Sequence, residues 1–577
     1  MGHEPPGLES RLGQIAARLD AVERRLAALE GLAPAGAPGP AAAPGAPAAA
    51  SSEDAALPSF GGALALTGRS LLILAGGFVL RSLTESGILP PALGVALGVL
   101  YGAAWLYFAG RAANSGTALG ATFHGLTSAV IVFPLLVEAT AKFKFLSPAA
   151  SAAAILTVAV LGLAVAQRRD LANLAWIVTL GAAAAALALA VTTRAVVLFA
   201  VVLFLLAAAG FASGWRRRWT GPGWTAVAIL DGFLLLLTSA VLVAPAEQAA
   251  QLVGPAALVA LLLALAVLSF GAFIVRTWRT GGPVLTGEIV QGAAAGLIGF
   301  GGALAVTHRT GAAATVAGVV GLLLAAAAYG ASFTFIDRIA GRRSSFIFYT
   351  STALAFALLG AFSLWRGPAL SLALSAAALA TAWIGSRWAR ETLSLHATIY
   401  LVAAAAAAGM GGLAWGALLR PGGLAPGSAI TPALLVVVVV AAAFCWLPVA
   451  SHGRTWGSLA RSVKAIGMIV LLLGLDELAV AVVAPRLPQG EDGQVSAPAL
   501  AVLRTALLSI SAVVLPLLGR FGRLREAVWL VYPLLVAGAL KLLFEDLRAA
   551  RPAALVLSFA LYGGALILAP RLAKRDG

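Results

Sequence analysis

The chain is dominated by a series of long apolar segments that runs from Phe60 to Pro570, with a polar or charged break about every 25 to 30 residues. A helix needs about 20 mostly apolar residues to cross the hydrocarbon core of a bilayer, and each segment provides that length. No segment alternates apolar and polar residues as a strand of a membrane β-barrel does. The sequence therefore predicts an all-α, polytopic helical membrane protein.

Composition agrees with this fold class. Apolar residues make up 61% of the chain and charged residues 11%, whereas soluble domains carry about 25% charged residues. A soluble core could not bury so much apolar surface, so the lipid bilayer is the expected surrounding. The net charge of +16 does not indicate a nucleic-acid partner, because the basic residues stand in twos and threes between apolar segments, as in cytoplasmic loops of membrane proteins.

We expect about 18 membrane spans, with boundaries defined to within a few residues. They lie near 60–80, 91–109, 117–138, 148–166, 171–191, 195–213, 222–244, 252–275, 283–306, 311–333, 346–365, 368–386, 392–414, 431–450, 464–484, 497–518, 527–546 and 552–570.

The distribution of charge predicts the orientation of these spans. With a cytoplasmic N-terminus, the connections on the inside hold 22 Lys and Arg residues and those on the outside hold 10. Basic residues collect in the cytoplasmic loops of membrane proteins. We therefore expect both termini in the cytoplasm, in a multi-pass protein.

Residues 8–29 carry a heptad pattern, with charged and polar residues between the apolar positions. The apolar positions are Leu8, Leu12, Ile15, Leu19, Val22, Leu26 and Leu29. Such a stripe predicts a short coiled coil with another copy of the chain or with another protein. The alternative is a helix that lies on the membrane face or folds back on the loops. No cleavable signal peptide is expected, because no apolar core with a small-residue cleavage site follows the polar N-terminus.

A Pro-, Ala- and Gly-rich stretch separates this helix from the first span, and its composition predicts a disordered tether. The expected organisation is a cytoplasmic coiled-coil helix at 1–32, a disordered linker at 33–59 and a polytopic transmembrane domain at 60–577. The tether would let the helical segment reach away from the membrane.

Three stretches of the chain resemble a bacterial family of large predicted polytopic membrane proteins of unknown function. They are FGGALALTGRSLLILAGGFVLRSLTESGILPP from residue 60, ARETLSLHATIYLVAAA from residue 389 and LVAGALKLLFEDLRAARPAALVLSFALYGGALIL from residue 535. That family has a short N-terminal coiled coil, a Pro/Ala-rich linker and many apolar spans. The resemblance implies an integral protein of a bacterial cytoplasmic (inner) membrane. It brings no activity and no catalytic residues.

The sequence offers no motif for catalysis, cofactor binding or metal binding. No two of its five histidines are three or four residues apart, and no phosphate-binding loop or GxSxG motif occurs. Cys445 is the single cysteine, which excludes an intramolecular disulfide and a metal site built from several cysteines. His124 and His396 lie within spans, where they would be members of a proton relay or hydrogen-bonded packing residues.

Small residues at four-residue spacing predict close approach of helices in the bundle. The two instances are Gly94, Gly98 and Gly102 in one span, and Gly292 and Gly296 in another. Packing alone explains such a pattern, so it does not indicate a ligand site.

Charged residues inside the spans are the candidates for an intramembrane polar site, because each costs about 2.5 to 3.5 kcal/mol at the centre of a membrane helix. The candidates are Asp231, Glu288, Asp476, Glu477, Arg504 and Lys541. Lys541 lies about five residues from the outer end of its span, so its ammonium group can reach the membrane surface, and Glu288 lies similarly near the inner end of its span. For these two residues, a structural role and a functional role are equally open. Asp231 lies about nine residues deep and is the strongest candidate for lining a cavity.

The positions of Asp476, Glu477 and Arg504 in consecutive spans predict an ion pair. At about 1.5 Å of rise per residue, Asp476 and Arg504 lie at nearly the same depth in helices that should be antiparallel neighbours. Adjacent side chains on a helix point about 100° apart, so Arg504 can pair with only one of the two acids. The other would need Lys541, a water-filled cavity or a proton.

These features leave three classes of function. The first is a transporter or channel-like protein, favoured by the number of spans and the deep carboxylates. The second is a structural or assembly protein that recruits partners through residues 8–29. The third is an enzyme that acts on lipid-linked substrates. A transporter should have a polar cavity near the middle of the membrane, whereas a scaffold should have its charges paired inside a closed bundle.

Overall fold

The computed structural model describes most of the expected transmembrane domain. The described residues are 76, 77, 79, 81–84, 86–216, 221–336, 343–388, 390–410, 430–447, 454–489, 495–521, 524–547 and 552–573. The chain divides into two units, Met1–Ala65 and Leu66–Gly577, and all described residues belong to the second. The expected coiled coil at 8–29 and linker at 33–59 lie outside the described residues, as does nearly all of the first expected span.

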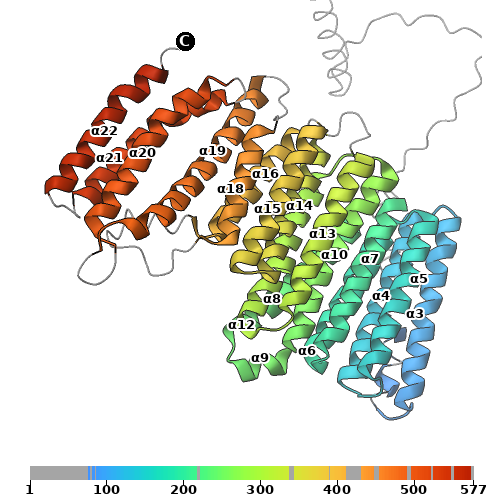
Figure 1. Cartoon of the computed structure of the whole chain (residues 1–577). Coiled ribbons are helices and arrows are strands. Elements are labelled where there is room, and N and C mark those ends of the chain that lie inside the picture. Colours follow the sequence, from blue (N-terminus) through green and yellow to red (C-terminus); the bar gives the residue numbers. More distant parts are fainter. Residues whose placement is uncertain are drawn as a thin grey trace, which may run out of the picture. The chain divides into compact units, whose positions relative to one another are not determined.

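The described part is helical, and 15 of its helical spans are long and apolar enough to cross a membrane. The first six are α3 (Pro91–Asn114), α4 (Ala118–Ala141), α5 (Pro148–Arg169), α6 (Ala172–Thr193), α7 (Val196–Arg216) and α8 (Gly221–Val243). A short helix, α9 (Ala246–Leu252), precedes α10 (Pro255–Thr280). This arrangement confirms the all-α polytopic fold (Figure 1).

The next spans contain two π-helical turns. One span is made of α11 (Thr286–Ala294), the π-helical turn η1 (Ala295–Gly301) and α12 (Gly302–Thr310). It is followed by α13 (Ala314–Ala331) with η2 (Ser332–Ile336), α14 (Arg343–Leu364) and α15 (Gly367–Arg387). Two shorter apolar helices come next, α16 (Glu391–Ala407) and α18 (Pro432–Trp446).

The remaining elements form the C-terminal part of the bundle. They are α19 (Arg454–Val483) with η3 (Ala484–Arg486), α20 (Ala497–Gly519), η4 (Arg525–Leu530), α21 (Val531–Lys541), η5 (Leu542–Asp546) and α22 (Pro552–Ala573). Counting the two shorter helices, every expected span from 91–109 to 552–570 coincides with a helical element. The only β-type pairing among the described residues is an isolated bridge between Gln489 and Val495.

Local sequence explains where many of these helices begin and end. Proline stands at the start of several of them, where its missing N–H has no helical acceptor and its fixed φ suits the first turn. At α5, Ser147 also caps the helix, because its Oγ accepts a hydrogen bond from the Ala150 amide at 3.2 Å. The same helix ends at Arg169, and Asp170 then adopts a left-handed conformation with φ 56°.

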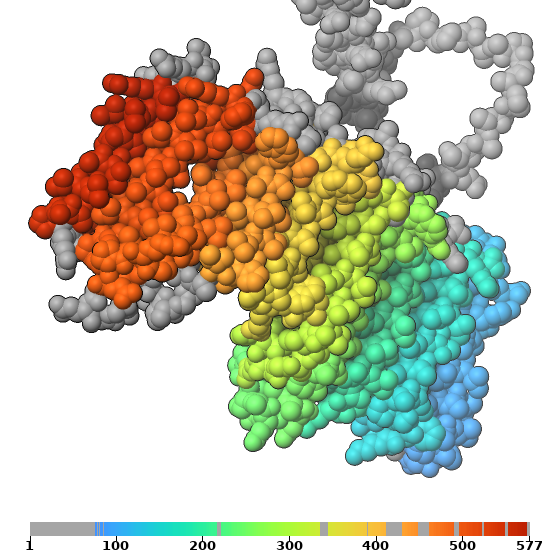
Figure 2. All heavy atoms as spheres, viewed as in Figure 1, coloured from blue at the N-terminus to red at the C-terminus, as the bar shows by residue number. Residues whose placement is uncertain are grey.

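Most of the extensive helix–helix contacts join helices that follow one another in sequence, but α20 packs on α22 across the intervening α21. The most extensive contacts join α3 with α4, α7 with α8, α13 with α14, α15 with α16 and α20 with α22. Figure 2 shows this as successive bands of colour along the described part. Buried apolar residues form three clusters, which extend from Leu106 to Phe356, from Leu354 to Val470 and from Cys445 to Ala569.

The α3 glycines provide the close approach that their spacing predicts. A Cβ atom added at Gly94, Gly98 or Gly102 would overlap a neighbouring side chain. The side chains in question are Thr84, Leu135 and Val132, respectively. Leu135 and Val132 belong to α4, so the absence of a side chain at these glycines lets α3 and α4 pack closely.

The second glycine pair behaves differently. A Cβ atom at Gly292 would lie 3.2 Å from the Phe348 ring, but one at Gly296 would meet nothing within 4 Å. The prediction of close approach is therefore wrong for Gly296. The reason is the π-helical turn at Ala295–Gly301, whose wider winding brings Gly299 to the packed face, where an added Cβ would lie 2.7 Å from the Leu262 carbonyl oxygen.

Candidate functional site

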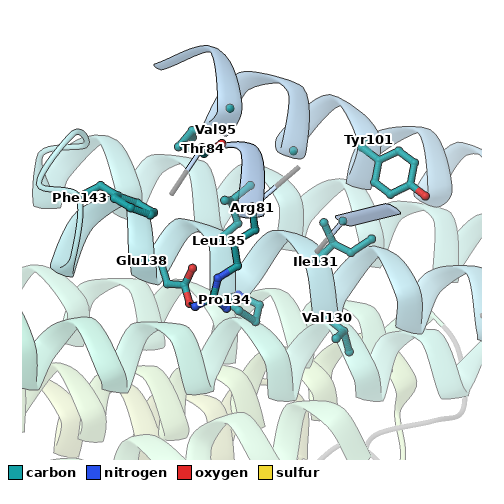
Figure 3. Close-up of a pocket in the computed structure, with 13 residues that line it drawn as sticks. Arg81, Thr84, Val95, Tyr101, Val130, Ile131, Pro134, Leu135, Glu138 and Phe143 are labelled. Carbon is teal, nitrogen blue, oxygen red and sulfur yellow. The ribbon is translucent and has the colours of Figure 1, made fainter. Parts of the chain in front are cut away.

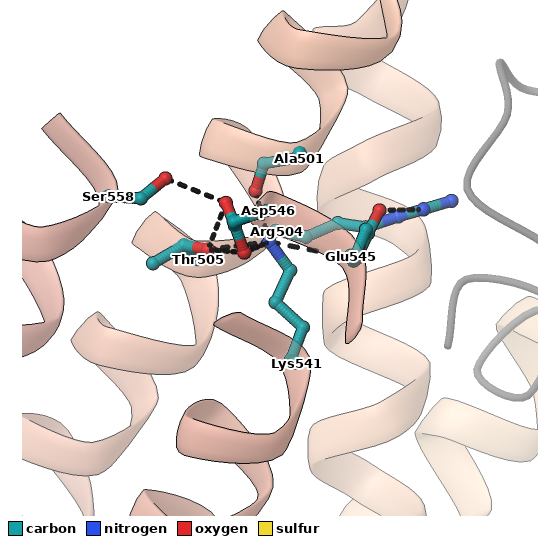
Figure 4. Close-up of polar contacts among 7 residues, drawn as sticks. All are labelled: Ala501, Arg504, Thr505, Lys541, Glu545, Asp546 and Ser558. Atoms are coloured by element: carbon teal, nitrogen blue, oxygen red, sulfur yellow. Dashed lines mark hydrogen bonds and ion pairs between the residues drawn. The ribbon is translucent and has the colours of Figure 1, made fainter. Parts of the chain in front are cut away.

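Among the described residues, the largest group of buried charged side chains lies between the last three membrane spans. Its members come from α20, from α21 and the π-helical turn η5 that continues it, and from α22 (Figure 4). We call it the α20–α22 polar cluster, and it consists of Arg504, Thr505, Lys541, Glu545, Asp546 and Ser558.

Asp546 is the acceptor at the centre of this cluster. Its Oδ2 accepts a hydrogen bond from Lys541 Nζ at 2.7 Å, and its Oδ1 accepts one from Ser558 Oγ at 2.7 Å. The Thr505 hydroxyl lies 3.2 Å from Oδ1 and 3.1 Å from Oδ2. Asp546 therefore connects α20, α21 and α22 through one carboxylate.

Lys541 uses all of its donors within the protein. Besides Asp546, its ammonium group donates to Thr505 Oγ1 at 2.5 Å and to the carbonyl oxygen of Ala501. An ammonium group has three N–H donors and no acceptor. Three protein oxygen atoms therefore take the three donors, and the carboxylate of Asp546 supplies the opposite charge.

The second ion pair of the cluster joins Arg504 to Glu545. Arg504 Nη1 donates to Glu545 Oε1 at 2.7 Å, and Glu545 is buried. Lys541 Nζ lies 3.6 Å from the other carboxylate oxygen, Glu545 Oε2, which has no hydrogen-bond partner among the described residues. Two cations and two acids thus balance in charge.

These contacts correct two expectations from the sequence. The side chain of Lys541 does not extend to the membrane surface, since it is only 4% exposed and points into the bundle. Arg504 pairs with Glu545 and not with Asp476 or Glu477. Glu545 and Asp546 are the last two residues of the expected span at 527–546, but they are not among the candidates predicted from the sequence. The i, i+4 spacing of Lys541 and Glu545 was the available signal.

Asp476 and Glu477 lie side by side on α19, and both side chains are partly buried. Neither forms an ion pair within the ranges that the structure describes, and Glu477 Oε1 has no hydrogen-bond partner there. The structure does not bring these two acids into the α20–α22 polar cluster.

Glu288 is paired with an arginine of the preceding span. Its carboxylate is 1% exposed and accepts hydrogen bonds from Nε and Nη2 of Arg276. The Leu285 amide donates to Glu288 Oε2 at 2.8 Å, and Arg276 Nη2 also donates to the Pro283 carbonyl oxygen at 2.7 Å. This arrangement fixes the turn between α10 and α11, and it leaves neither carboxylate oxygen without a donor.

Asp231 has a neutral partner. It is buried on α8, and Gln291 Nε2 on α11 donates to its Oδ2 at 2.7 Å. Its Oδ1 has no hydrogen-bond partner among the described residues. On the same helix, Leu230 and Leu234 are fully buried. Gln291 carries no charge, so it is not among the charged candidates predicted from the sequence, although an amide inside a span is itself an unusual polar group.

The two histidines of interest contact aromatic residues. His396 is buried, and its Nδ1 lies 3.0 Å from the Tyr329 hydroxyl, which lies 3.4 Å from the Tyr400 hydroxyl. His124 stacks on Trp105 with ring centroids 5.1 Å apart. Such contacts occur both in packing residues and in proton relays, so they do not distinguish the two interpretations of these histidines.

A pocket of about 190 Å³ lies between α3, α4 and the segment just before α3 (Figure 3). One end is polar, with Arg81 Nη2 2.9 Å from Glu138 Oε1. The rest of its wall is mostly apolar, and the residues that line it there include Val95, Val130 and Leu135.

Within the described residues, no three His, Cys, Asp or Glu side chains lie close enough together to hold a metal ion. No protein-family model matches the chain, and no curated protein matches it. The function must therefore be inferred from the geometry of the described polar groups.

Proposed function

We propose that this chain is a structural or assembly protein of a bacterial cytoplasmic membrane, which recruits partners through its N-terminal residues 8–29. Its membrane domain would serve as the anchor, with both termini in the cytoplasm. The resemblance to the bacterial family of polytopic membrane proteins supports this location. The charge pairing in the α20–α22 polar cluster supports the structural role.

The argument from the cluster rests on the use of its hydrogen-bonding groups. A transport site must exchange its contacts with a substrate, so some of its charged groups need access to water or to a cavity. In the cluster, the three donors of Lys541 and both oxygens of Asp546 are taken by protein atoms. Although Glu545 Oε2 has no hydrogen-bond partner among the described residues, this pairing of charges by protein atoms favours a joint between helices over a pathway for ions.

The role of the N-terminal helix can be tested with matched variants of the full chain. Leu12→Glu with Leu19→Glu places two charges on the apolar seam. Gln14→Glu with Ala17→Glu adds the same number of acids at positions that the heptad pattern directs outward. We expect the seam variant to reduce the size of the membrane-extracted complex on a native gel, and the control variant to leave it unchanged.

Membrane insertion should be normal in both variants, because the spans lie after residue 60. Deletion of residues 1–58 should have the same effect as the seam variant. If the seam variant and the deletion both leave the complex size unchanged, the coiled-coil proposal is wrong and the helix folds back on its own chain or the membrane.

A transporter or channel-like function is the second candidate, and Asp231 is the observation that favours it. A buried carboxylate oxygen without a hydrogen-bond donor is costly in an apolar interior. A proton or a small cation at Asp231 Oδ1 would remove that cost. Asp231→Asn keeps the size of the side chain and removes the charge, so it should abolish proton or sodium flux into proteoliposomes if this function holds. If the wild-type protein shows no proton or sodium flux, this candidate is eliminated.

A further inference from the structure

The pocket between α3 and α4 is elongated along the two helices. Its polar end contains Arg81 and Glu138, and Glu138 lies three residues before the end of α4 at Ala141. Its other end reaches Tyr101 on α3 and Ile131 on α4. The seven residues from Glu138 back to Ile131 correspond to about 10 Å along the helix. The pocket therefore begins close to a membrane edge and extends toward the middle of the span.

The pocket opens toward the surface of the bundle. Val130, one of its lining residues, is 46% exposed, and Pro134, one turn further along α4, is also exposed. The surface that a transmembrane helix exposes faces lipid. A molecule can therefore enter this pocket sideways from the bilayer.

The lining is suited to hydrocarbon. An apolar cavity of about 150 Å³ stays free of water and takes up a molecule as large as benzene. The 190 Å³ pocket is larger, and apart from Tyr101 its deep part is bounded by apolar side chains. It can therefore receive part of an acyl chain, but its apolar walls offer water few hydrogen-bond partners.

The polar end carries both signs of charge. Arg81 and Glu138 form an ion pair in which the side chains are 38% and 23% exposed, so each still presents surface to a ligand. A guanidinium group binds phosphate through parallel hydrogen bonds. A carboxylate accepts hydrogen bonds from a primary ammonium group. The pair is thus complementary to a head group in which a phosphate and a primary amine lie close together.

From these observations we propose that the α3–α4 pocket is a binding site for a phospholipid with a phosphoethanolamine head group. One acyl chain occupies the apolar part of the pocket. The phosphate lies against Arg81, and the ammonium group lies against Glu138. The proposal does not depend on the assembly function, because it concerns only α3, α4 and the residues just before them.

The same chemistry predicts selectivity among head groups. Phosphatidylglycerol has the phosphate but no ammonium group, so it leaves the negative charge of Glu138 facing an anion. Phosphatidylcholine has a quaternary ammonium group, which has no N–H donor for the carboxylate. Phosphatidylethanolamine should therefore be retained in preference to both.

Lipid retention can be measured on the full chain. The protein is reconstituted in nanodiscs with equal amounts of phosphatidylethanolamine, phosphatidylglycerol and phosphatidylcholine. The protein is then released from the nanodiscs in the mass spectrometer, and the lipids that remain bound to it are counted by native mass spectrometry. We expect one retained phosphatidylethanolamine per chain. Val130→Trp fills the pocket from its exposed side and should lower retention at least tenfold. Val160→Trp makes the same change on α5, where the side chain is 56% exposed, and should retain the lipid.

Charge variants test the head-group contacts. Arg81→Gln should reduce retention of both phosphatidylethanolamine and phosphatidylglycerol, whereas Glu138→Gln should reduce only the preference for phosphatidylethanolamine. A second measurement uses the wild-type chain alone, with phosphatidylethanolamine that carries a photoreactive acyl chain. Crosslinks should map to residues 95–101 and 130–135. Equal retention of all three lipids, full retention by Val130→Trp, or crosslinks spread evenly over the helices would each overturn the proposal.

Discussion

Lys541 and Asp546 form a buried ion pair across five residues of a single span, with Lys541 Nζ 2.7 Å from Asp546 Oδ2. In a regular α-helix, side chains five residues apart point about 140° away from each other, because each residue turns the helix by about 100°. The π-helical turn at Leu542–Asp546 changes this, since its hydrogen bonds run from residue i to residue i+5. The Leu547 amide accordingly donates to the Leu542 carbonyl oxygen at 3.0 Å. The turn thus places Asp546 over Lys541.

Replacing one member of this pair should destabilise the protein strongly. Replacing both members should destabilise it less. Lys541→Met leaves Asp546 charged in a buried site, and Asp546→Leu leaves the ammonium group there. Each single variant should lower the free energy of unfolding by about 3 to 5 kcal/mol. The double variant should lose much less than the sum, because no unpaired charge remains. Thermal unfolding of the purified protein in detergent would measure this, and additive losses would contradict the pair.

Arg504 should be energetically coupled to Glu545 and not to Glu477. A double-mutant cycle with Arg504→Met and Glu545→Gln should give an interaction energy of about 0.5 to 3 kcal/mol. The matched cycle with Glu477→Gln removes an acid on α19 that Arg504 does not contact, and it should give a value close to zero. Larger coupling to Glu477 would show that α19 and α20 pack in the way first expected from the sequence.

Gln291 should be needed to hold Asp231. Gln291→Leu removes the donor to the buried carboxylate and should cost about 1 to 3 kcal/mol of stability. Gln251→Leu makes the same change at an exposed position of α9 and should have little effect. Adding Asp231→Asn to Gln291→Leu should recover part of the loss, because it removes the buried charge. Equal melting temperatures for Gln291→Leu and Gln251→Leu would show that the hydrogen bond contributes little.

The contact between α3 and α4 should not tolerate a methyl group at Gly102. Its Cβ atom would overlap Val132, so Gly102→Ala should cost about 1 to 3 kcal/mol. Gly110→Ala on the same helix is the control, since its Cβ would lie 3.7 Å from Val165, an ordinary contact distance. In the Gly102→Ala background, Val132→Ala should restore stability by making room. If Gly102→Ala leaves the stability unchanged, the two helices can move apart at little cost.

The orientation of the membrane domain can be tested with reporter fusions. The split of 22 to 10 basic residues predicts that a reporter at residue 577 lies in the cytoplasm and that one in the loop near residue 490 lies outside. An alkaline phosphatase reporter should be active only at residue 490, and a fluorescent protein only at residue 577. The same compartment for both sites would invalidate the orientation.

The sequence alone predicted the helical elements. A segment of about 20 apolar residues can satisfy its backbone hydrogen bonds in lipid only as a helix or within a closed barrel, so length and hydropathy are sufficient to locate a span. For this reason the expected spans from 91–109 to 552–570 all coincide with helices. The spacing of the α3 glycines also predicted their packed face, whereas the same spacing failed at Gly296, where a π-helical turn interrupts the regular helix.

The tertiary structure decided which polar groups meet. Arg504 and Glu545 are 41 residues apart, and Asp231 and Gln291 are 60 apart, so their pairing depends on which helices become neighbours. The depth of a charge in its span gives no information about the direction in which its side chain points. The π-helical turn after Lys541 brings Asp546 over the ammonium group, so Lys541 has a buried partner and does not reach the membrane surface. Apolar length is a property of each segment by itself, whereas the neutralisation of a buried charge depends on atoms from several segments, and only the folded bundle brings those atoms together.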